Sequence, residues 1–230
     1  PSDLGYEDDR YALPPLEVVE RVVAGSAVSE GALFVTVAET LQERRAARKA
    51  SIPSRVAACV ADVNAEPGES WVIWCDLNAE GDALSAAMPE AVEVRGSDDP
   101  DTKEARLAGF ASGKHRILIS KPSICGWGLN WQHAARMAFV GVTDSWEAYY
   151  QAVRRCWRFG QKRPVRVHVY ASEAEGAVTA NLARKEAEAT ALGAALSAET
   201  RAAVFESVRG SKPVHLDYSP STPMEVPSWL

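Results

Sequence analysis

The sequence predicts an α/β protein in which a parallel sheet carries helices on both faces. Short apolar runs such as Trp71 to Cys75 have the length of strands that are buried on both sides. Longer stretches of helical composition separate these runs, as in a chain built from strand–helix–strand units. In such a sheet, the loops at the carboxyl ends of the strands form the usual ligand-binding edge.

Composition and charge limit the class of protein. The 230 residues, 47% hydrophobic and 24% charged, suffice for one sizeable core. The formal net charge of −6 excludes a surface that is basic throughout, so any contact with nucleic acid must come from a local patch. No apolar run approaches the roughly 18 residues that span a bilayer, and no secretory signal opens the sequence, so we expect a cytoplasmic protein without a membrane partner. Because the sequence starts at Pro1 without a methionine, we expect a piece of a longer protein.

The cysteines and histidines predict no metal site. The four cysteines are widely separated and none belongs to a C-x-x-C pair, which is typical of reduced intracellular thiols. The four histidines likewise lack ligand spacing. We therefore expect neither a disulfide framework nor a bound metal.

The N-terminal part of the chain is predicted to lead into the main domain. Residues 1–30 are interpreted as a linker and residues 31–172 as the domain. Val18 to Val23 and Ala32 to Val37 are predicted strands around a Gly25-Ser26 turn.

Two helices are predicted between Ala38 and Asn64, because Pro53 interrupts the helical composition. Their basic residues have two possible interpretations: a solvated helix face, which is the commoner case, or a patch that contacts the phosphates of DNA. These residues are Arg44, Arg45, Arg48, Lys49 and Arg55.

The middle of the chain continues the alternation. Asp76 to Glu80 opens a short helix, and a later helix starts with Asp99 as N-cap and Pro100 as its first residue. The acidic residues around that cap resemble nuclease carboxylates, but capping and the helix dipole explain them better. They are Asp98, Asp99 and Asp101. The remaining predicted strands are Ala91 to Val94, Arg116 to Ser120, Arg136 to Val142 and Val165 to Tyr170.

The segment from Gly109 to Lys114 is only superficially similar to a phosphate-binding loop. Its glycine spacing is one residue short of G-x-x-x-x-G-K-[ST], and His115 replaces the Ser or Thr that would bind magnesium. The segment also precedes a strand instead of following one. The sequence therefore predicts no phosphate-cradling loop in this chain.

A helix with two unlike faces is predicted from Asp144, which forms a capping-box pattern with Glu147, to the stop at Phe159-Gly160. At 100° per residue, an apolar stripe lies opposite a polar one. A solvated basic face is the common explanation for such a polar stripe. Because this stripe holds arginine and glutamine only, it also favours a helix that grips a polyphosphate with planar guanidinium groups. The apolar stripe is Trp146, Tyr150, Val153 and Trp157; the polar one is Gln151, Arg154, Arg155 and Arg158.

The C-terminal region is predicted to contain helices over residues 173–209, broken near Gly193, and an extended tail over 210–230. The apolar residues of these helices would pack back on the sheet or on a neighbour. They are Leu182, Leu192, Leu196 and Phe205.

Several of these segments resemble the Swi/Snf-type branch of superfamily-two helicase-like ATPases. Gln151 to Gln161 is similar to motif VI of that branch, Q-A-x-G-R-x-x-R-x-G-Q, and Gly126 to Gln132 is similar to motif V, G-x-G-L-N-L. Trp71 to Asp76 and Val94-Arg95-Gly96 stand where motif IV and its follower would, so the resemblance covers about residues 70 to 170. The tryptophan-rich stretches GWGLNWQ and RRCWRFGQ are most similar to helicases encoded by bacteriophages. The departures are Arg154 in place of the family's glycine and Trp131 in place of an aliphatic residue.

The resemblance implies the second RecA-like lobe of an ATP-dependent DNA helicase or translocase. Arg155 and Arg158 would then be arginine fingers. Nucleotide contacts would come from Gln151, Gly128 and Asn130, and nucleic-acid contacts from Lys121, Ser123, Gly96 and Ser97.

The rest of the active site would belong to an N-terminal RecA-like lobe of the same parent protein, which would hold ATP with its Mg²⁺. This chain alone would then be inactive. The alternative is a non-catalytic nucleic-acid-binding module, in which the same arginines grip phosphates of the nucleic acid.

Overall fold

The computed structural model describes residues 12–23, 41–125, 129–141 and 145–172, together with short pieces between 184 and 200. The chain divides into two compact units: Asp9–Ala189 contains the sheet, and Pro1–Asp8 with Thr190–Leu230 form the other. The strand predicted at Ala32 to Val37 and the tail predicted over 210–230 lie outside the described residues.

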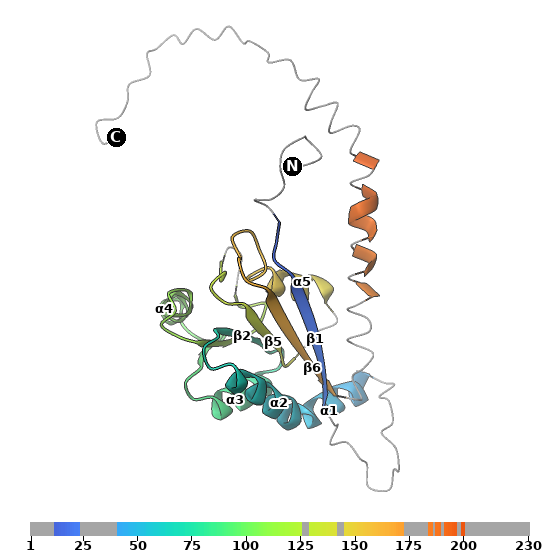
Figure 1. Ribbon diagram of the computed structural model, residues 1–230. Coiled ribbons are helices and arrows are strands. Elements are labelled where there is room, and N and C mark those ends of the chain that lie inside the picture. Colours follow the sequence, from blue (N-terminus) through green and yellow to red (C-terminus); the bar gives the residue numbers. More distant parts are fainter. Residues whose placement is uncertain are drawn as a thin grey trace, which may run out of the picture. The chain divides into compact units, whose positions relative to one another are not determined.

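The first unit is built on a six-stranded sheet in the order β1-β6-β5-β2-β4-β3, and every pair of neighbours is parallel (Figure 1). The α/β prediction is therefore confirmed, and the carboxyl ends of all strands lie at one edge. The strands are β1 (Leu16–Val23), β2 (Trp71–Trp74), β3 (Val92–Val94), β4 (Ile117–Ser120), β5 (Arg136–Phe139) and β6 (Val165–Ser172).

Each face of the sheet has its own apolar core, because successive side chains of a strand point to opposite faces. In β2, Trp71 and Ile73 belong to the core on one face, whereas Val72 and Trp74 belong to the core on the other. All four side chains are fully buried, as expected for a central strand of a parallel sheet.

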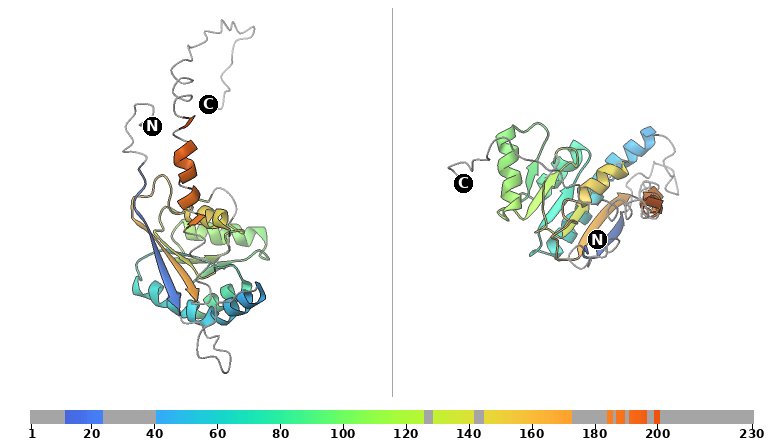
Figure 2. Two further views of the ribbon diagram at one scale, coloured as in Figure 1. Left: turned by 90° about the vertical axis from the view of Figure 1, so that its right-hand side faces the viewer. Right: turned by 90° about the horizontal axis from the view of Figure 1, so that it is seen from above.

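Helices cover both faces, as predicted. The α2 and α3 helices pack on the Trp71 side, whereas α4 and α5 pack on the Trp74 side. Figures 1 and 2 show α1, α2 and α3 together, with α5 across the strands from them. The helices are α1 (Leu41–Ala50), α2 (Ile52–Ala65), α3 (Asn78–Ala87), α4 (Pro100–Ala111) and α5 (Trp146–Val153).

The acidic residues near α4 have structural roles. The Asp99 carboxylate accepts a hydrogen bond from the Thr102 amide at 2.9 Å, so it caps α4, with Pro100 next, as predicted. Asp98 accepts from the Arg95 amide and from the Arg106 guanidinium, both at 2.8 Å. Capping and local pairing therefore account for these carboxylates.

The basic residues of α1 and α2 require a correction. Arg55 and Glu80 form a buried ion pair of 2.8 Å, with side chains 1% and 0% exposed. Arg48 pairs with Glu80 at 3.4 Å and with Asp76 at 3.1 Å. Both interpretations made from the sequence are wrong for Arg55, because its charge is neutralised inside the protein. Its partner lies 25 residues further along the chain, beyond the reach of a helical pattern.

The helical pieces of the C-terminal region also correct a prediction. Residues 191–196 are helical, so the helix continues through Gly193 instead of breaking there. Leu192 and Leu196 are 62% and 56% exposed, so their packing on an absent neighbour stays a prediction. The side chains of Leu182 and Phe205 lie outside the described residues.

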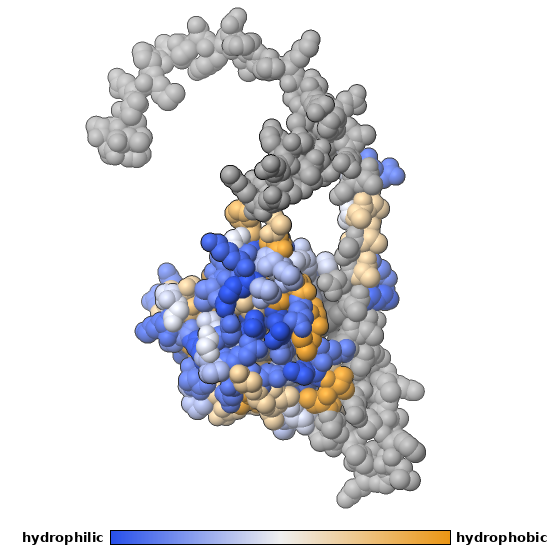
Figure 3. Space-filling view, viewed as in Figure 1, coloured by the Kyte–Doolittle hydropathy of each residue, from blue (hydrophilic) through white to orange (hydrophobic). Residues whose placement is uncertain are grey.

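The surface of the first unit is mostly hydrophilic on the side shown in Figure 3, with a strip of apolar residues along β1. Val18 and Val22 of this edge strand are 47% and 60% exposed. Among the described residues, no helix has the length and apolar character needed to cross a bilayer.

Candidate functional site

Hydrogen bonds join two segments of the chain. One lies in the loop between β4 and β5, and the other directly follows α5. We call residues 129–134 the Trp131 loop and residues 154–161 the arginine turn. The Trp131 amide donates to the Arg155 carbonyl at 2.9 Å, and the Gln132 side chain donates to the Phe159 carbonyl at 3.2 Å. The Gln161 carboxamide donates to the Ala134 carbonyl at 3.0 Å. The two segments that carry the motif resemblance are therefore one structural feature.

These hydrogen bonds explain why α5 ends earlier than predicted. The helix stops at Val153, and Arg154, Arg155 and Arg158 lie in the turns that follow. After Val153 the amides of Arg155 and Cys156 donate to the carbonyls three residues back, and the Arg155 carbonyl accepts from the Trp131 amide. The prediction of one arginine-bearing helix face is wrong for this reason.

The start and the buried face of α5 also differ from prediction. Ser145 is the N-cap, and its hydroxyl accepts from the Ala148 amide at 3.2 Å. Asp144 lies outside the described residues. The helix buries Tyr149, Ala152 and Val153, whereas Tyr150 is 37% exposed. The buried face of α5 therefore contains Tyr149 instead of the predicted Tyr150.

The arginine turn carries positive charge without a carboxylate partner among the described residues. Elsewhere in the described part, each arginine whose side chain is placed forms an ion pair with a carboxylate. Within the turn, the Arg154 guanidinium lies over the aromatic rings of Tyr150 and Trp157. Arg155 and Arg158 therefore remain as cations able to receive an anion.

Arg155 is half-buried, and burial lowers the pKa of its guanidinium, with the positive charge of Arg158 acting in the same direction. An anion that binds beside a desolvated cation with a second cation nearby stabilises it, because the anion supplies the missing counter-charge. The Arg155 position therefore favours binding of a negatively charged group such as phosphate.

Arg158 is oriented by the Trp131 loop. One guanidinium nitrogen donates to the side-chain oxygen of Asn130, and the Nε atom is buried without a partner among the described residues. The Asn130 carboxamide orients the Arg158 guanidinium without neutralising its positive charge, since an amide carries no net charge.

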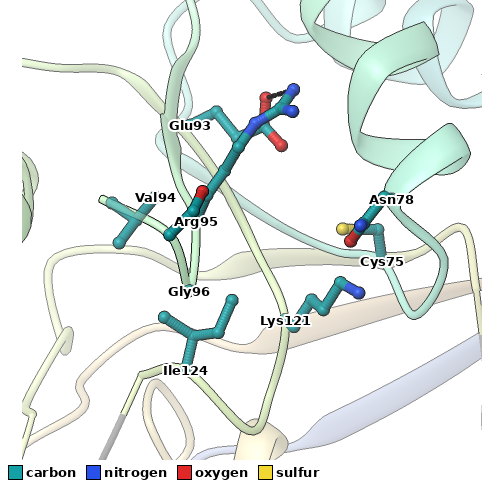
Figure 4. Close-up of a pocket in the computed structure, with 9 residues that line it drawn as sticks. Cys75, Asn78, Glu93, Val94, Arg95, Gly96, Lys121 and Ile124 are labelled. Carbon is teal, nitrogen blue, oxygen red and sulfur yellow. Dashed lines mark hydrogen bonds and ion pairs between the residues drawn. The ribbon is translucent and has the colours of Figure 1, made fainter.

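A second candidate feature is a cavity of about 330 Å³ at the carboxyl ends of β2, β3 and β4 (Figure 4). It is contained within the first unit. Three loops surround it, one after each of these strands. Its lining residues are Cys75, Asn78, Glu93, Val94, Arg95, Gly96, Ser97, Lys121 and Ile124.

Of the two cations that line this cavity, Arg95 and Lys121, only Arg95 is paired with described carboxylates. Arg95 pairs with Asp82 at 2.6 Å and with Glu93 at 2.7 Å, so its charge is neutralised. Lys121 forms no ion pair with any described carboxylate, and in Figure 4 its ammonium group extends toward Cys75 and Asn78. Burial raises the pKa of the Cys75 thiol to about 12, so this neighbour stays neutral. Lys121 is therefore the cation that the cavity offers to a ligand.

Comparisons with known proteins agree with this geometry. The family model of the helicase conserved C-terminal domain matches residues 55–160. The fold is similar to the crystal structure of the C-terminal part of the Fun30 ATPase domain, with a TM-score of 0.51, 16% identity, and coverage of 56% of this chain and 45% of that one. It is also similar to the RNA-helicase Prp28 from Chaetomium thermophilum bound to ADP, with a TM-score of 0.55, 14% identity, and coverage of 76% and 37%. The C-terminal domain of the DEAD-box protein Dbp5 gives a TM-score of 0.52, 11% identity, and coverage of 59% and 80%.

This is the fold of a helicase C-terminal lobe. The RecA-like architecture predicted from the motifs is thereby confirmed. The chain spans less than half the length of the Fun30 and Prp28 chains that it matches. Comparison with curated protein sequences finds no significant match.

The structure places the predicted site residues in two groups. Asn130, Arg155 and Arg158 meet at the arginine turn, and Gln151 lies on the last turn of α5. Gly96, Ser97 and Lys121 line the cavity, whereas Ser123 is exposed and does not line it. Gly128 lies outside the described residues.

Two residues that line the cavity, Asn78 and Cys75, were not predicted from the sequence. Cys75 directly follows the buried strand β2, and Asn78 opens α3 three residues later. Their position at a carboxyl strand end was the signal available, because parallel sheets gather ligand-binding residues there.

Proposed function

We propose that this chain is the C-terminal lobe of an ATP-dependent DNA helicase or translocase. In this proposal Arg155 and Arg158 are arginine fingers for ATP held by an N-terminal lobe of the parent protein. The observation that carries it is the absence of any described carboxylate partner for either arginine, in a lobe where the other placed arginines outside the turn are paired.

The proposed chemistry is charge stabilisation. During phosphoryl transfer, negative charge is spread over the γ-phosphate oxygens, and a guanidinium fork can contact two of them. Mg²⁺ and the phosphate-cradling loop belong to the other lobe in this scheme. Asn130 orients Arg158 through its side-chain oxygen, and Gln151 and Gly128 are proposed to contact the nucleotide.

The cavity at the carboxyl ends of β2, β3 and β4 is proposed to contact the backbone of the nucleic acid. Lys121 supplies the unpaired positive charge, and the Gly96-Ser97 turn forms the neighbouring wall. A wall of small residues lets a backbone approach closely. Ser123, exposed on the adjoining loop, is proposed to contact the same strand at the margin of the cavity.

ATP hydrolysis with and without DNA tests the proposal. The chain alone should not hydrolyse ATP. The chain joined to the N-terminal lobe of its parent protein should hydrolyse ATP, and DNA should stimulate this activity. Arg155→Ala and Arg158→Ala should each lower turnover, by about 10³–10⁵ for a full finger. The matched control is Arg166→Ala, since Arg166 lies on β6 and is paired with Glu17 and Glu66.

Unchanged turnover in Arg158→Ala would overturn the finger assignment. Hydrolysis by the chain alone would show that it contains a complete active site. Retained DNA binding with no hydrolysis by the two-lobe protein would favour the binding-module alternative. Comparing stimulation by DNA and by RNA of the same sequence tests the choice of DNA.

A further inference from the structure

Trp157 lies in the arginine turn between the two proposed fingers, and its side chain reaches a distant part of the chain. The indole N–H donates to the Pro14 carbonyl at 2.8 Å, across 143 residues of sequence. Tryptophan has a single polar atom, which can only donate. The arginine turn is therefore attached at one defined point to the segment that precedes β1.

The segment around Pro14 is the lead-in to the sheet, which we define as residues 12–15. The Pro15 carbonyl accepts from the Val165 amide at 2.9 Å, and Leu16 is the first residue of β1, in register with Val165. Proline has no amide hydrogen, so Pro14 and Pro15 can form backbone hydrogen bonds only through their carbonyls. Trp157 supplies the first of these two attachments, and β6 supplies the second.

The Arg154 guanidinium lies over the ring of Trp157. Its guanidinium carbon lies 5.3 Å from the Trp157 ring centre and 5.8 Å from that of Tyr150. Trp146 stacks on Tyr150 at 4.9 Å between ring centres. A continuous row of rings and one cation thus runs from the start of α5 to the lead-in.

This row explains the residue that departs from the motif pattern. Arg154 stands where the resembling family has glycine, and a glycine has no side chain to place over the indole. The cation has no described carboxylate partner, so the two rings are its main described contacts. Arg154 and Trp157 therefore form a single arrangement.

We propose that Arg154 and Trp157 are positioning residues that join the arginine turn to the lead-in, so that nucleotide binding at the turn alters the lead-in. The nucleotide half of this proposal rests on the proposed function above. The attachment itself rests only on the hydrogen bond and the ring contacts. Because Pro14 is partly exposed, water can replace a lost indole donor, and the fold should survive its removal.

The test uses the two-lobe protein and the variants Trp157→Phe and Arg154→Gly. Phenylalanine keeps a ring under Arg154 but removes the N–H, and glycine restores the family residue. Arg154→Lys retains the positive charge and can still lie over a ring, so it should preserve most of the effect. Trp146→Phe is the matched control, because it changes another tryptophan of the row that makes no described contact with Pro14.

The first readout is amide hydrogen exchange of Val165, which reports on the lead-in through the Pro15 carbonyl. Trp157→Phe should exchange about tenfold faster there without nucleotide, while Trp146→Phe should match the wild type. A non-hydrolysable ATP analogue should slow this exchange in the wild type and leave it unchanged in Trp157→Phe and Arg154→Gly. Turnover should fall about fivefold in both variants with KM for ATP unchanged, as expected from losing one hydrogen bond that orients the fingers.

These outcomes separate the two proposals. Unaltered Val165 exchange in Trp157→Phe would overturn the attachment, even if the protein hydrolyses ATP normally. An equal response to the analogue in the wild type and the variants would overturn the transmission of the nucleotide signal. A wild type that binds no ATP would refute the proposed function and the nucleotide half of this inference, while the nucleotide-free exchange still decides the attachment.

Discussion

The side-chain oxygen of Asn130 accepts a hydrogen bond from the guanidinium of Arg158, 28 residues further along the chain. The Trp131 loop thereby fixes the direction of the arginine without cancelling its charge. An asparagine suits this role because its oxygen is a neutral acceptor. A carboxylate in the same place would form an ion pair and withdraw the arginine from any phosphate.

The first prediction concerns this residue. Asn130→Ala should lower ATP turnover in the two-lobe protein about tenfold, because Arg158 loses its orienting acceptor. Asn130→Asp should lower it further, since the new carboxylate competes with phosphate for the guanidinium. Steady-state kinetics measures both. Asn64→Ala, on the exposed surface of α2, serves as the control, and equal activity of the Asp and Ala variants would contradict this account.

The second prediction concerns the cavity. Lys121→Ala should weaken DNA binding and reduce the slope of log K against log salt by about 0.9, the effect of one lost phosphate contact. Fluorescence anisotropy at several salt concentrations measures the slope. Lys114→Ala is the control, because Lys114 is an exposed lysine that does not line the cavity. A parallel loss of affinity at all salt concentrations, with the slope unchanged, would argue against a phosphate contact.

The third prediction concerns stability. Glu80→Ala should lower the free energy of unfolding by about 3–5 kcal/mol, because it breaks the buried 2.8 Å ion pair between Glu80 and Arg55. Burial opposes ionisation of Glu80, but Arg48 and Arg55 outweigh it and hold the pKa of this carboxyl below its usual range. Urea denaturation gives the difference. Glu90→Ala, which breaks a more exposed pair of 3.7 Å with Arg116, should cost about 1 kcal/mol or less.

Sequence reasoning placed the strands well because their signal is local. The β2 and β4 strands are short apolar runs that are buried on both faces, and no partner needs to be known to recognise them. The cap of α4 by Asp99 is equally local, since donor and acceptor lie three residues apart. The order of the strands in the sheet then brings the cavity loops together.

Several features that sequence reasoning missed depend on distant partners. The α5 helix gives way to tighter turns after Val153, where the Arg155 carbonyl accepts from the Trp131 amide of another loop. Arg55 is withdrawn from the surface by Glu80, and Trp157 is held by Pro14. Helical periodicity describes neighbours three and four residues apart, so it contains no information on these contacts.

The last prediction concerns the pH dependence of stability, which follows from a buried cluster on β6 and α2. The Asp62 carboxylate accepts from the Tyr170 hydroxyl at 2.7 Å and lies 3.0 Å from His168 Nδ1. Arg21 of β1 also contacts Asp62 at 3.3 Å, and Cys59 and Arg166 are the other ionisable groups that influence the cluster.

Burial lowers the pKa of His168, although Asp62 acts against this effect. Burial would raise the pKa of Asp62, but the hydrogen bonds from Tyr170 and His168 outweigh it and hold that pKa below its usual value. The unfolded chain therefore binds protons at both groups more readily than the folded protein does. Stability should be highest above the unfolded histidine pKa of about 6.5 and should fall as the pH drops below it, with Asp62 adding to the loss near pH 4.

Urea midpoints at pH 7.5, 6.5 and 5.5 measure this dependence, and His168→Gln should flatten it over that range because glutamine does not titrate. His133 also has a pKa lowered by burial, so His133→Gln should remove a separate part of the slope, and the double variant should remove both. A His168→Gln variant as sensitive to acid as the wild type would show that the cluster on β6 does not govern the response. A wild type that gains stability as the pH falls from 7.5 to 5.5 would contradict the direction of both shifts, since folding would then have to favour the protonated imidazole.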